Sequence, residues 1–179
     1  MQKQINFFSR SLIILLLAAC NSGANTTDEV EQAQMSSAPY TVYVTYSNDC
    51  PFCIRYTKTL QDIKNELPEY WDFKFLKVIG EEEWDFDWKE SLSDDVIDDV
   101  DAIYIDRFGM DVYPQAVIAD SVGNILYKGA IDDRAHQTGL SKFKVTKKYL
   151  QSAITSISQG ESPRWKHTEA VGCYIEDHE

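Results

Sequence analysis

The chain has 179 residues, with 29 acidic against 17 basic side chains and a formal net charge of −12. Its length suits a single domain, and 44% hydrophobic with 12% aromatic residues can build a core, so a disordered acidic tail is excluded. Nucleic-acid binding is excluded too, because it requires clustered Lys and Arg side chains and this chain has the opposite excess.

Residues 1–19 read as a secretory signal. Two basic residues precede the apolar run 12–17, which is shorter than the ~20 apolar residues that a membrane-spanning helix needs. The run leads into Leu17-Ala18-Ala19-Cys20, which resembles the lipobox of bacterial lipoproteins. This resemblance implies cleavage before Cys20 and a lipid on that cysteine. The alternative is an ordinary signal with an incidental cysteine.

The mature chain is expected to begin with a flexible tether, residues 20–39, which lacks apolar periodicity. Asn21 follows the cysteine at the position where lipoproteins retained on the inner membrane carry Asp. We therefore expect an exported lipoprotein anchored on the outer membrane or at the periplasmic face. The folded domain is expected over residues 40–179, including a C-terminal Gly-Cys tail.

The first half of this domain predicts a strand, a helix and a second strand. Tyr40–Tyr46 is aromatic and β-branched, as in a strand covered on both faces. In Pro51–Leu67 the apolar residues recur at spacings of three and four, which predicts an amphipathic helix. Trp71–Ile79 reads as the second strand. This order implies parallel pairing and an α/β fold.

The second half predicts a helix, a hairpin and a last helix. We expect the first helix over Val96–Phe108, and a β-hairpin from Gln115–Ala119 and Ile125–Gly129. Lys142–Ser158 predicts the last helix, which Gly160 would end. The expected fold is α/β, with a central mixed sheet of about four strands flanked by helices.

The motif Cys50-Pro51-Phe52-Cys53 lies where the first strand passes into the helix. Ser47-Asn48-Asp49 supplies turn residues before it, with Asp49 expected as the helix N-cap. At the helix start, Cys50 meets unpaired backbone N–H groups and the positive end of the helix dipole, which favour a thiolate. Cys53, one turn later, can resolve a mixed disulfide formed on Cys50. This setting predicts thiol-disulfide exchange.

Other interpretations of the cysteine pair stay open. It could be half of a zinc site, although a second C-x-x-C or H-x-x-x-H motif is missing. It could be an inert disulfide, which an exported location permits. Cys50 could attack peroxide in a thiol peroxidase. A copper or other soft-metal module could use Cys50, Cys53 and His136 as ligands. A fifth alternative is an interaction scaffold.

The order of strand, C-x-x-C, helix start, Val112-Tyr113-Pro114 and hairpin resembles the thioredoxin-like superfamily. Within it, four segments resemble the redoxin-type branch of exported proteins: Cys50–Tyr56, Tyr127–Asp133, Val145–Leu150 and Thr168–Glu176.

This resemblance implies a thioredoxin-like fold and a thiol-disulfide oxidoreductase without cofactor or metal, acting on protein or small-molecule disulfides and thiols. It implies that Cys50 attacks, that Cys53 resolves, and that Pro114 is a cis-proline. The backbone of Tyr113 would then be open to strand-like pairing with a substrate. One departure is Val44, which stands where thioredoxin has a buried carboxylate. Oxidants, reductants and isomerases share this arrangement, so the motif does not set the direction of electron flow.

Two features are left without a role. Cys173 is an odd cysteine once Cys20 carries a lipid. It either exchanges disulfides, with Cys50 or with a partner, or packs as a small residue behind Gly172. The segment Glu81–Asp101 has eleven acidic residues and one basic residue, and we expect a solvated face.

Overall fold

The structure is a computed structural model that describes residues 37–78, 95–99, 101–137, 140–142 and 144–175. The expected signal, Cys20 and nearly all of the expected tether lie outside the described residues, as does most of the acidic segment. In the part of the chain that is described, no helix is long and apolar enough to cross a membrane.

A five-stranded mixed sheet forms the centre of the domain, in the order β3-β2-β1-β5-β6. β1 pairs in parallel with β2, as the strand-helix-strand order predicted, and β2 pairs in parallel with β3. β5 is antiparallel to both β1 and β6, which confirms the hairpin. The strands of this sheet are β1 (Tyr40–Thr45), β2 (Trp71–Val78), β3 (Val96–Asp99), β5 (Ala116–Asp120) and β6 (Ile125–Gly129).

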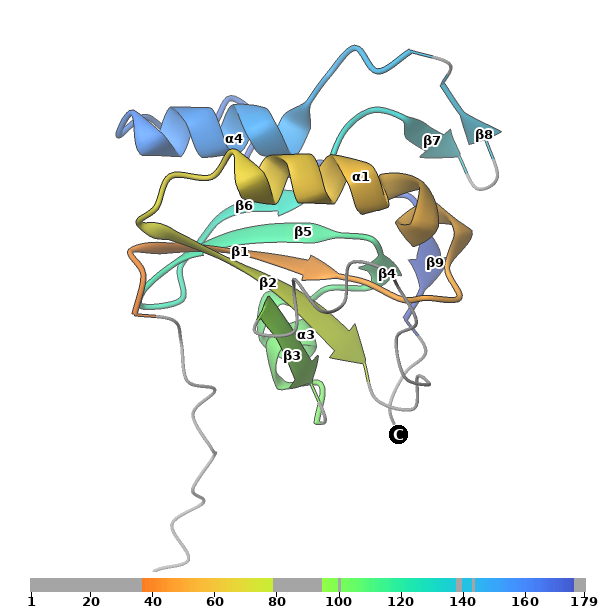
Figure 1. Ribbon diagram of the computed structural model, residues 1–179, viewed down its shortest axis with the longest axis horizontal. Coiled ribbons are helices and arrows are strands. Elements are labelled where there is room, and N and C mark those ends of the chain that lie inside the picture. Colours follow the sequence, from red (N-terminus) through yellow and green to blue (C-terminus); the bar gives the residue numbers. More distant parts are fainter. Residues whose placement is uncertain (1–36, 79–94, 100, 138–139, 143, 176–179) are drawn as a thin grey trace, which may run out of the picture. The chain divides into compact units, whose positions relative to one another are not determined.

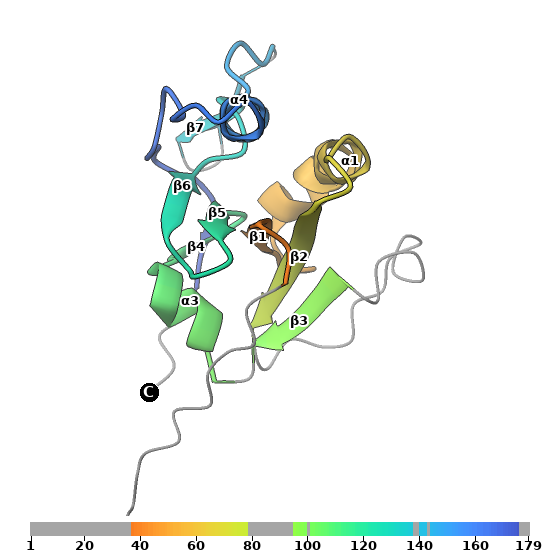
Figure 2. The same ribbon diagram turned by 90° about the vertical axis from the view of Figure 1, so that its left-hand side faces the viewer.

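Helices cover both faces of the sheet (Figures 1 and 2). α1 (Pro51–Asn65) and α4 (Tyr149–Ser158) lie on one face, and α3 (Ile103–Phe108) lies on the other. Two short pairs complete the described elements: β4 (Val112–Tyr113) with β9 (Cys173–Tyr174), and β7 (Ala135–Gln137) with β8 (Leu140–Ser141). This topology is the thioredoxin-like fold that the sequence predicted.

The core lies between the sheet and its helices because the central strand is covered on both faces. Val42, Tyr43 and Val44 of β1 are all fully buried. Successive side chains of a strand point to opposite faces, so a run of buried residues requires cover on both sides. α1 buries one face against this sheet, through Phe52, Cys53, Tyr56, Leu60 and Ile63.

The prediction of a helix over Val96–Phe108 was wrong in its first part. Val96–Asp99 forms β3, the edge strand that raises the sheet from about four strands to five, and only Ile103–Phe108 is helical. Val96 and Ile97 favour a strand, and the outer edge of β2 offers them a parallel partner. The buried Asp99 then accepts hydrogen bonds from the backbone N–H groups of Tyr104 and Ile105, which fixes the start of α3.

The last helix begins at Tyr149 and not at Lys142, which corrects its predicted start. Asp133 is the reason, since its carboxylate accepts hydrogen bonds from the backbone N–H groups of Thr146 and Lys147, at 2.8 and 2.9 Å. These bonds hold the preceding residues as a loop. The end of the helix is as predicted, with Gly160 following it at a positive φ of 74°.

Candidate active site

Cys50 occupies the N-cap position of α1, and Pro51 is the first helical residue. The prediction of Asp49 as N-cap was therefore wrong by one residue. A residue before proline is restricted to extended backbone, and Cys50 has φ −85° and ψ 114°, so the helix can begin only after it. In the described part of the chain no side chain caps this helix end. The sulfur of Cys50 thus lies directly at the start of the helix.

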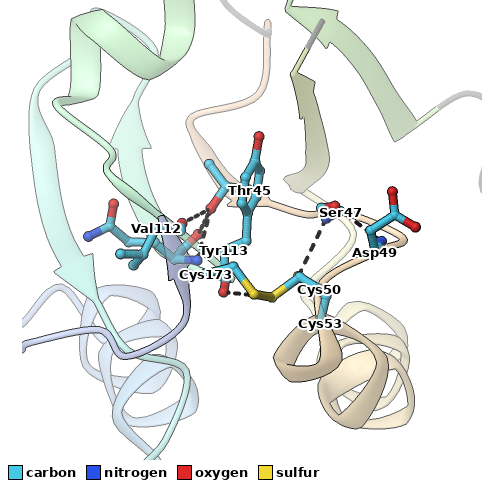
Figure 3. The surroundings of a disulfide bond; sticks show 9 residues. Thr45, Ser47, Asp49, Cys50, Cys53, Val112, Tyr113 and Cys173 are labelled. Atoms are coloured by element: carbon cyan, nitrogen blue, oxygen red, sulfur yellow. Dashed lines mark hydrogen bonds between the residues drawn. A yellow bond between two sulfur atoms is a disulfide. The ribbon is translucent and has the colours of Figure 1, made fainter. Parts of the chain in front are cut away.

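A disulfide joins Cys50 to Cys173 across 123 residues of sequence, with the two Cα atoms 6.1 Å apart. Figure 3 shows the bridge between the first turn of α1 and the strand β9. Cys50 is buried, with only 2% of its surface exposed while the tail lies over it. The structure therefore brings Cys173 to Cys50, the first of the two fates that the sequence left open for it.

The Tyr113-Pro114 peptide bond is cis, as the resemblance implied. Cys50 Sγ lies 3.3 Å from the carbonyl oxygen of Tyr113, to which a Cys50 thiol could donate a hydrogen bond once the disulfide is reduced. Tyr113 also belongs to β4, which pairs antiparallel with β9. In this pairing Tyr113 is opposite Cys173 and Val112 is opposite Tyr174. The backbone expected to be open to substrates thus holds the chain's own tail.

Thr45 holds the proline loop in place and was not predicted as a site residue. Its buried hydroxyl donates to the carbonyl of Val112 at 2.7 Å (Figure 3). The same hydroxyl accepts from the N–H of Gln115 at 2.9 Å. The only signal in the sequence is a threonine in the last position of a strand that is buried on both faces, where a hydroxyl must find a partner.

Cys53 lies one helical turn after Cys50, fully buried and outside the disulfide. Its Sγ accepts a hydrogen bond from the backbone N–H of Ser47 at 3.4 Å. Next to it, burial raises the pKa of Tyr46 to about 12, although a hydrogen bond with Thr57 lowers it. The Tyr46 phenol therefore stays protonated at neutral pH and is no general base.

The predicted site residues fall into two groups. Cys50, Tyr113, Pro114 and Cys173 meet at one place, with Cys53 beneath them, whereas Cys20 lies outside the described residues. His136, considered as a soft-metal ligand, is exposed on β7. No group of three His, Cys, Asp or Glu side chains able to hold a metal ion occurs among the residues that the structure describes.

No protein-family model matches this chain, and no curated protein matches it. Solved structures do resemble it. An uncharacterised conserved protein from Geobacillus kaustophilus is 17% identical, covering 83% of this chain and 82% of that one, with a TM-score of 0.59. A hypothetical protein from Sinorhizobium meliloti is 18% identical, covering 77% and 79%, with a TM-score of 0.54. At these identities the likeness shows the fold alone.

Proposed function

We propose that this chain is a thiol-disulfide oxidoreductase in which Cys50 attacks a disulfide and Cys53 resolves the mixed disulfide. Cys173 acts as a third redox cysteine, and the backbone at Tyr113 and Pro114 receives the substrate. The observation that carries the proposal is the bond that Cys50 makes with Cys173 at the start of α1, beside a second buried cysteine.

The surroundings of each sulfur support these roles. A sulfur at a helix N-terminus is stabilised as the thiolate, which is the nucleophile in exchange reactions. The N–H of Ser47 donates a hydrogen bond to Cys53 Sγ and so holds this sulfur in place one turn after Cys50. Thr45 fixes the proline loop against which Cys50 lies.

The reaction conserves electrons over four sulfurs, those of Cys50 and Cys53 and the two of the substrate disulfide. The Cys50 thiolate attacks one sulfur of the substrate disulfide, and the other sulfur leaves as a thiolate with the electron pair of the broken bond. The Cys53 thiolate then attacks Cys50 Sγ, forms the Cys50–Cys53 disulfide and releases the second substrate thiolate. In sum, two protein thiols are oxidised and one substrate disulfide is reduced. The reverse sequence oxidises a dithiol.

Trapping experiments test the assignment. Because Cys53 and Cys173 can both resolve, the double variant Cys53→Ser/Cys173→Ser should accumulate a disulfide-linked adduct when the reduced protein meets insulin as a protein disulfide. A non-reducing gel measures the adduct. Cys173→Ser alone should keep turning over, and Cys50→Ser should fall to background.

Two outcomes decide against the proposal. Cys50→Ser protein that still reduces insulin, or a double variant that traps nothing while its circular dichroism is unchanged, would contradict it. Running the same variants with hydrogen peroxide as oxidant separates the oxidoreductase from a thiol peroxidase, which would consume peroxide in preference to the protein disulfide.

A further inference from the structure

The tail residues Gly172 to Ile175 lie in the candidate site as an extended peptide. β9 pairs with β4, and the N–H of Ile175 donates to the carbonyl of Asp111 at 3.0 Å. A disulfide to Cys50 and a short backbone ladder thus hold the same segment (Figure 3). These are the two contacts that a polypeptide substrate would make here: one covalent bond to Cys50 and one set of hydrogen bonds to the neighbouring edge.

Gly172, immediately before the cysteine, fits because it has no side chain. A Cβ at this position would lie 1.8 Å from the carbonyl oxygen of Tyr113 and 2.6 Å from its carbonyl carbon. Both are backbone atoms, and the same carbonyl oxygen lies 3.3 Å from Cys50 Sγ. The site therefore has no room for a side chain beside the reacting sulfur.

Backbone conformation does not explain this glycine. Gly129 and Gly160 have positive φ values of 144° and 74°, where glycine is favoured whatever the space around it. Gly172 is not among the positive-φ residues of the described chain. Space against Tyr113 is the remaining reason for a glycine here.

The residue after the cysteine is under no such restriction. Tyr174 pairs with Val112 through its backbone, while the residue as a whole is 80% exposed. The site thus excludes a side chain at the position immediately before the cysteine and accepts one at the position immediately after it.

We propose that residues 172–174 occupy the substrate position of this site, and that the polypeptides it accepts in their place carry a glycine directly before the reactive cysteine. This inference rests on the proposed function, because it names the substrate class of the Cys50 site. In the step concerned, the Cys50 thiolate attacks the cysteine sulfur of a peptide disulfide. The Cys50–peptide bond forms, and the other half of the disulfide leaves as a thiolate with the electron pair.

Activated peptides test the selectivity on the full chain. The variant Cys20→Ser/Cys53→Ser/Cys173→Ser replaces three of the four cysteines of the sequence and keeps Cys50. The probes are Ala-Val-Gly-Cys-Tyr-Ile, its Gly→Ala form and its Tyr→Ser form, each with the cysteine coupled to thionitrobenzoate. Attack on the peptide sulfur releases the coloured thiolate, so absorbance gives the rate. The Gly→Ala peptide should react about tenfold more slowly or worse, because overpacking against fixed atoms is costly. The Tyr→Ser peptide should stay within about threefold of the parent, since the Tyr174 side chain is exposed.

The outcomes distinguish a failure of the glycine selectivity from a failure of the proposed oxidoreductase function. Equal rates for the Gly and Ala peptides overturn the selectivity. If Cys50 fails to react even with the small symmetric disulfide of thionitrobenzoate while the fold is intact, the proposed function fails instead.

A second measurement uses the tail itself. In Cys20→Ser protein oxidised in a glutathione buffer, Gly172→Ala should lower the ratio of Cys50–Cys173 to Cys50–Cys53 disulfide by about tenfold. The matched control, Tyr174→Ala, should leave the ratio unchanged. Non-reducing peptide mapping by mass spectrometry gives both values, and an unchanged ratio in Gly172→Ala overturns the inference.

Discussion

At the scale of single residues, the carboxylate of Asp133 shows how one side chain fixes a loop. It is 5% exposed and accepts hydrogen bonds from Lys142 Nζ at 2.8 Å and from the Thr146 hydroxyl at 2.5 Å, besides two backbone N–H groups. Burial alone would raise the pKa of Asp133, but these donors outweigh it and hold the pKa well below its usual range. The charged form of Asp133 therefore stabilises the folded chain.

We expect Asp133→Asn to lower the free energy of unfolding by about 2 kcal/mol at pH 7, since hydrogen bonds to a charged group are lost. The folded-state pKa lies below the unfolded one, so this stability is present above about pH 4 and is lost as the pH falls towards the folded pKa. Urea unfolding at pH 7 and pH 3 should show the difference between the two proteins shrinking in acid. Asp62→Asn, at an exposed carboxylate, is the control and should change stability by less than about 0.5 kcal/mol. A difference that is the same at both pH values contradicts the assignment.

The sequence predicted some site residues and missed others for a physical reason. The spacing of Cys50 and Cys53 identifies them in the sequence, since a helix turn brings residues three apart together. Pro114 was found through a family resemblance. Thr45 and Gly172 act through contacts with the proline loop, about 60 to 70 residues away in sequence, and no local pattern encodes such a contact.

At the scale of elements, the tail is anchored before it reaches the site. The backbone of residues 166–168 pairs with Lys128 at the edge of β6. Thr168 Oγ1 accepts from the N–H of Ala130 at 2.9 Å and shares a hydrogen bond with the Tyr127 hydroxyl. Gly129 makes room, because a Cβ there would lie 2.1 Å from the Thr168 carbonyl oxygen. The anchor places Cys173 within reach of Cys50.

Thr168→Val should loosen this anchor while leaving the cysteines intact. In a Cys20→Ser/Cys53→Ser background, only the Cys50–Cys173 disulfide can form within the chain. Its equilibrium with reduced and oxidised glutathione should shift towards the thiols by roughly fivefold to thirtyfold, for the loss of one or two hydrogen bonds. His167→Ala is the matched control, because His167 is exposed and pairs through its backbone. If both variants behave as the parent does, the anchor does not position Cys173.

Two of the sequence motifs, Cys50–Tyr56 and Tyr127–Asp133, are in direct contact. Tyr56, at the end of the C-x-x-C segment, donates its hydroxyl to Asp132 at 2.6 Å. Arg134 stacks on the Tyr56 ring, with its guanidinium 4.7 Å from the ring centroid, and donates to the backbone carbonyl of Arg55. These contacts fasten α1 to the loop that follows β6, so Tyr56 and Asp132 serve the packing around the site.

Element prediction succeeded where the pattern was local. α1, β2 and the hairpin have alternating or helical apolar spacing, and the structure confirms them. β3 was missed because its four residues carry two apolar and two acidic side chains without alternation, and only the edge of β2 makes them a strand. Pairing with a neighbour decided its structure, as is common for short strands.

At the scale of the whole molecule, the folded domain and the expected membrane attachment are separate questions. The first described strand, β1, begins at Tyr40, as the sequence predicted for that strand. We propose that a lipid on Cys20 tethers this domain at the exported face of the membrane. The lipobox lies outside the described residues, and so does the acidic segment apart from residues 95–99 and 101, which include β3. The role of the lipid therefore rests on the sequence.

Cys20→Ala should abolish incorporation of labelled fatty acid and move the protein from the membrane fraction to the soluble fraction. The thermal unfolding of the domain should not change, because Cys20 precedes its first strand. Cys53→Ser, which leaves the lipobox intact, is the control and should keep the label. Label retained in Cys20→Ala protein contradicts the tether.

The position of Cys173 opposite Tyr113 has a consequence for how the protein stores its oxidised state. Attack of Cys53 on Cys50 Sγ exchanges the Cys50–Cys173 bridge for a Cys50–Cys53 bridge and frees the Cys173 thiolate. The two forms are isomers at one oxidation level, so their ratio does not depend on the redox potential of the surroundings. The surrounding thiols decide only whether a bridge exists, and whatever competes with the tail for the Val112–Tyr113 edge decides which bridge it is. A partner that binds this edge can therefore change which disulfide the oxidised protein carries, without any electron being gained or lost.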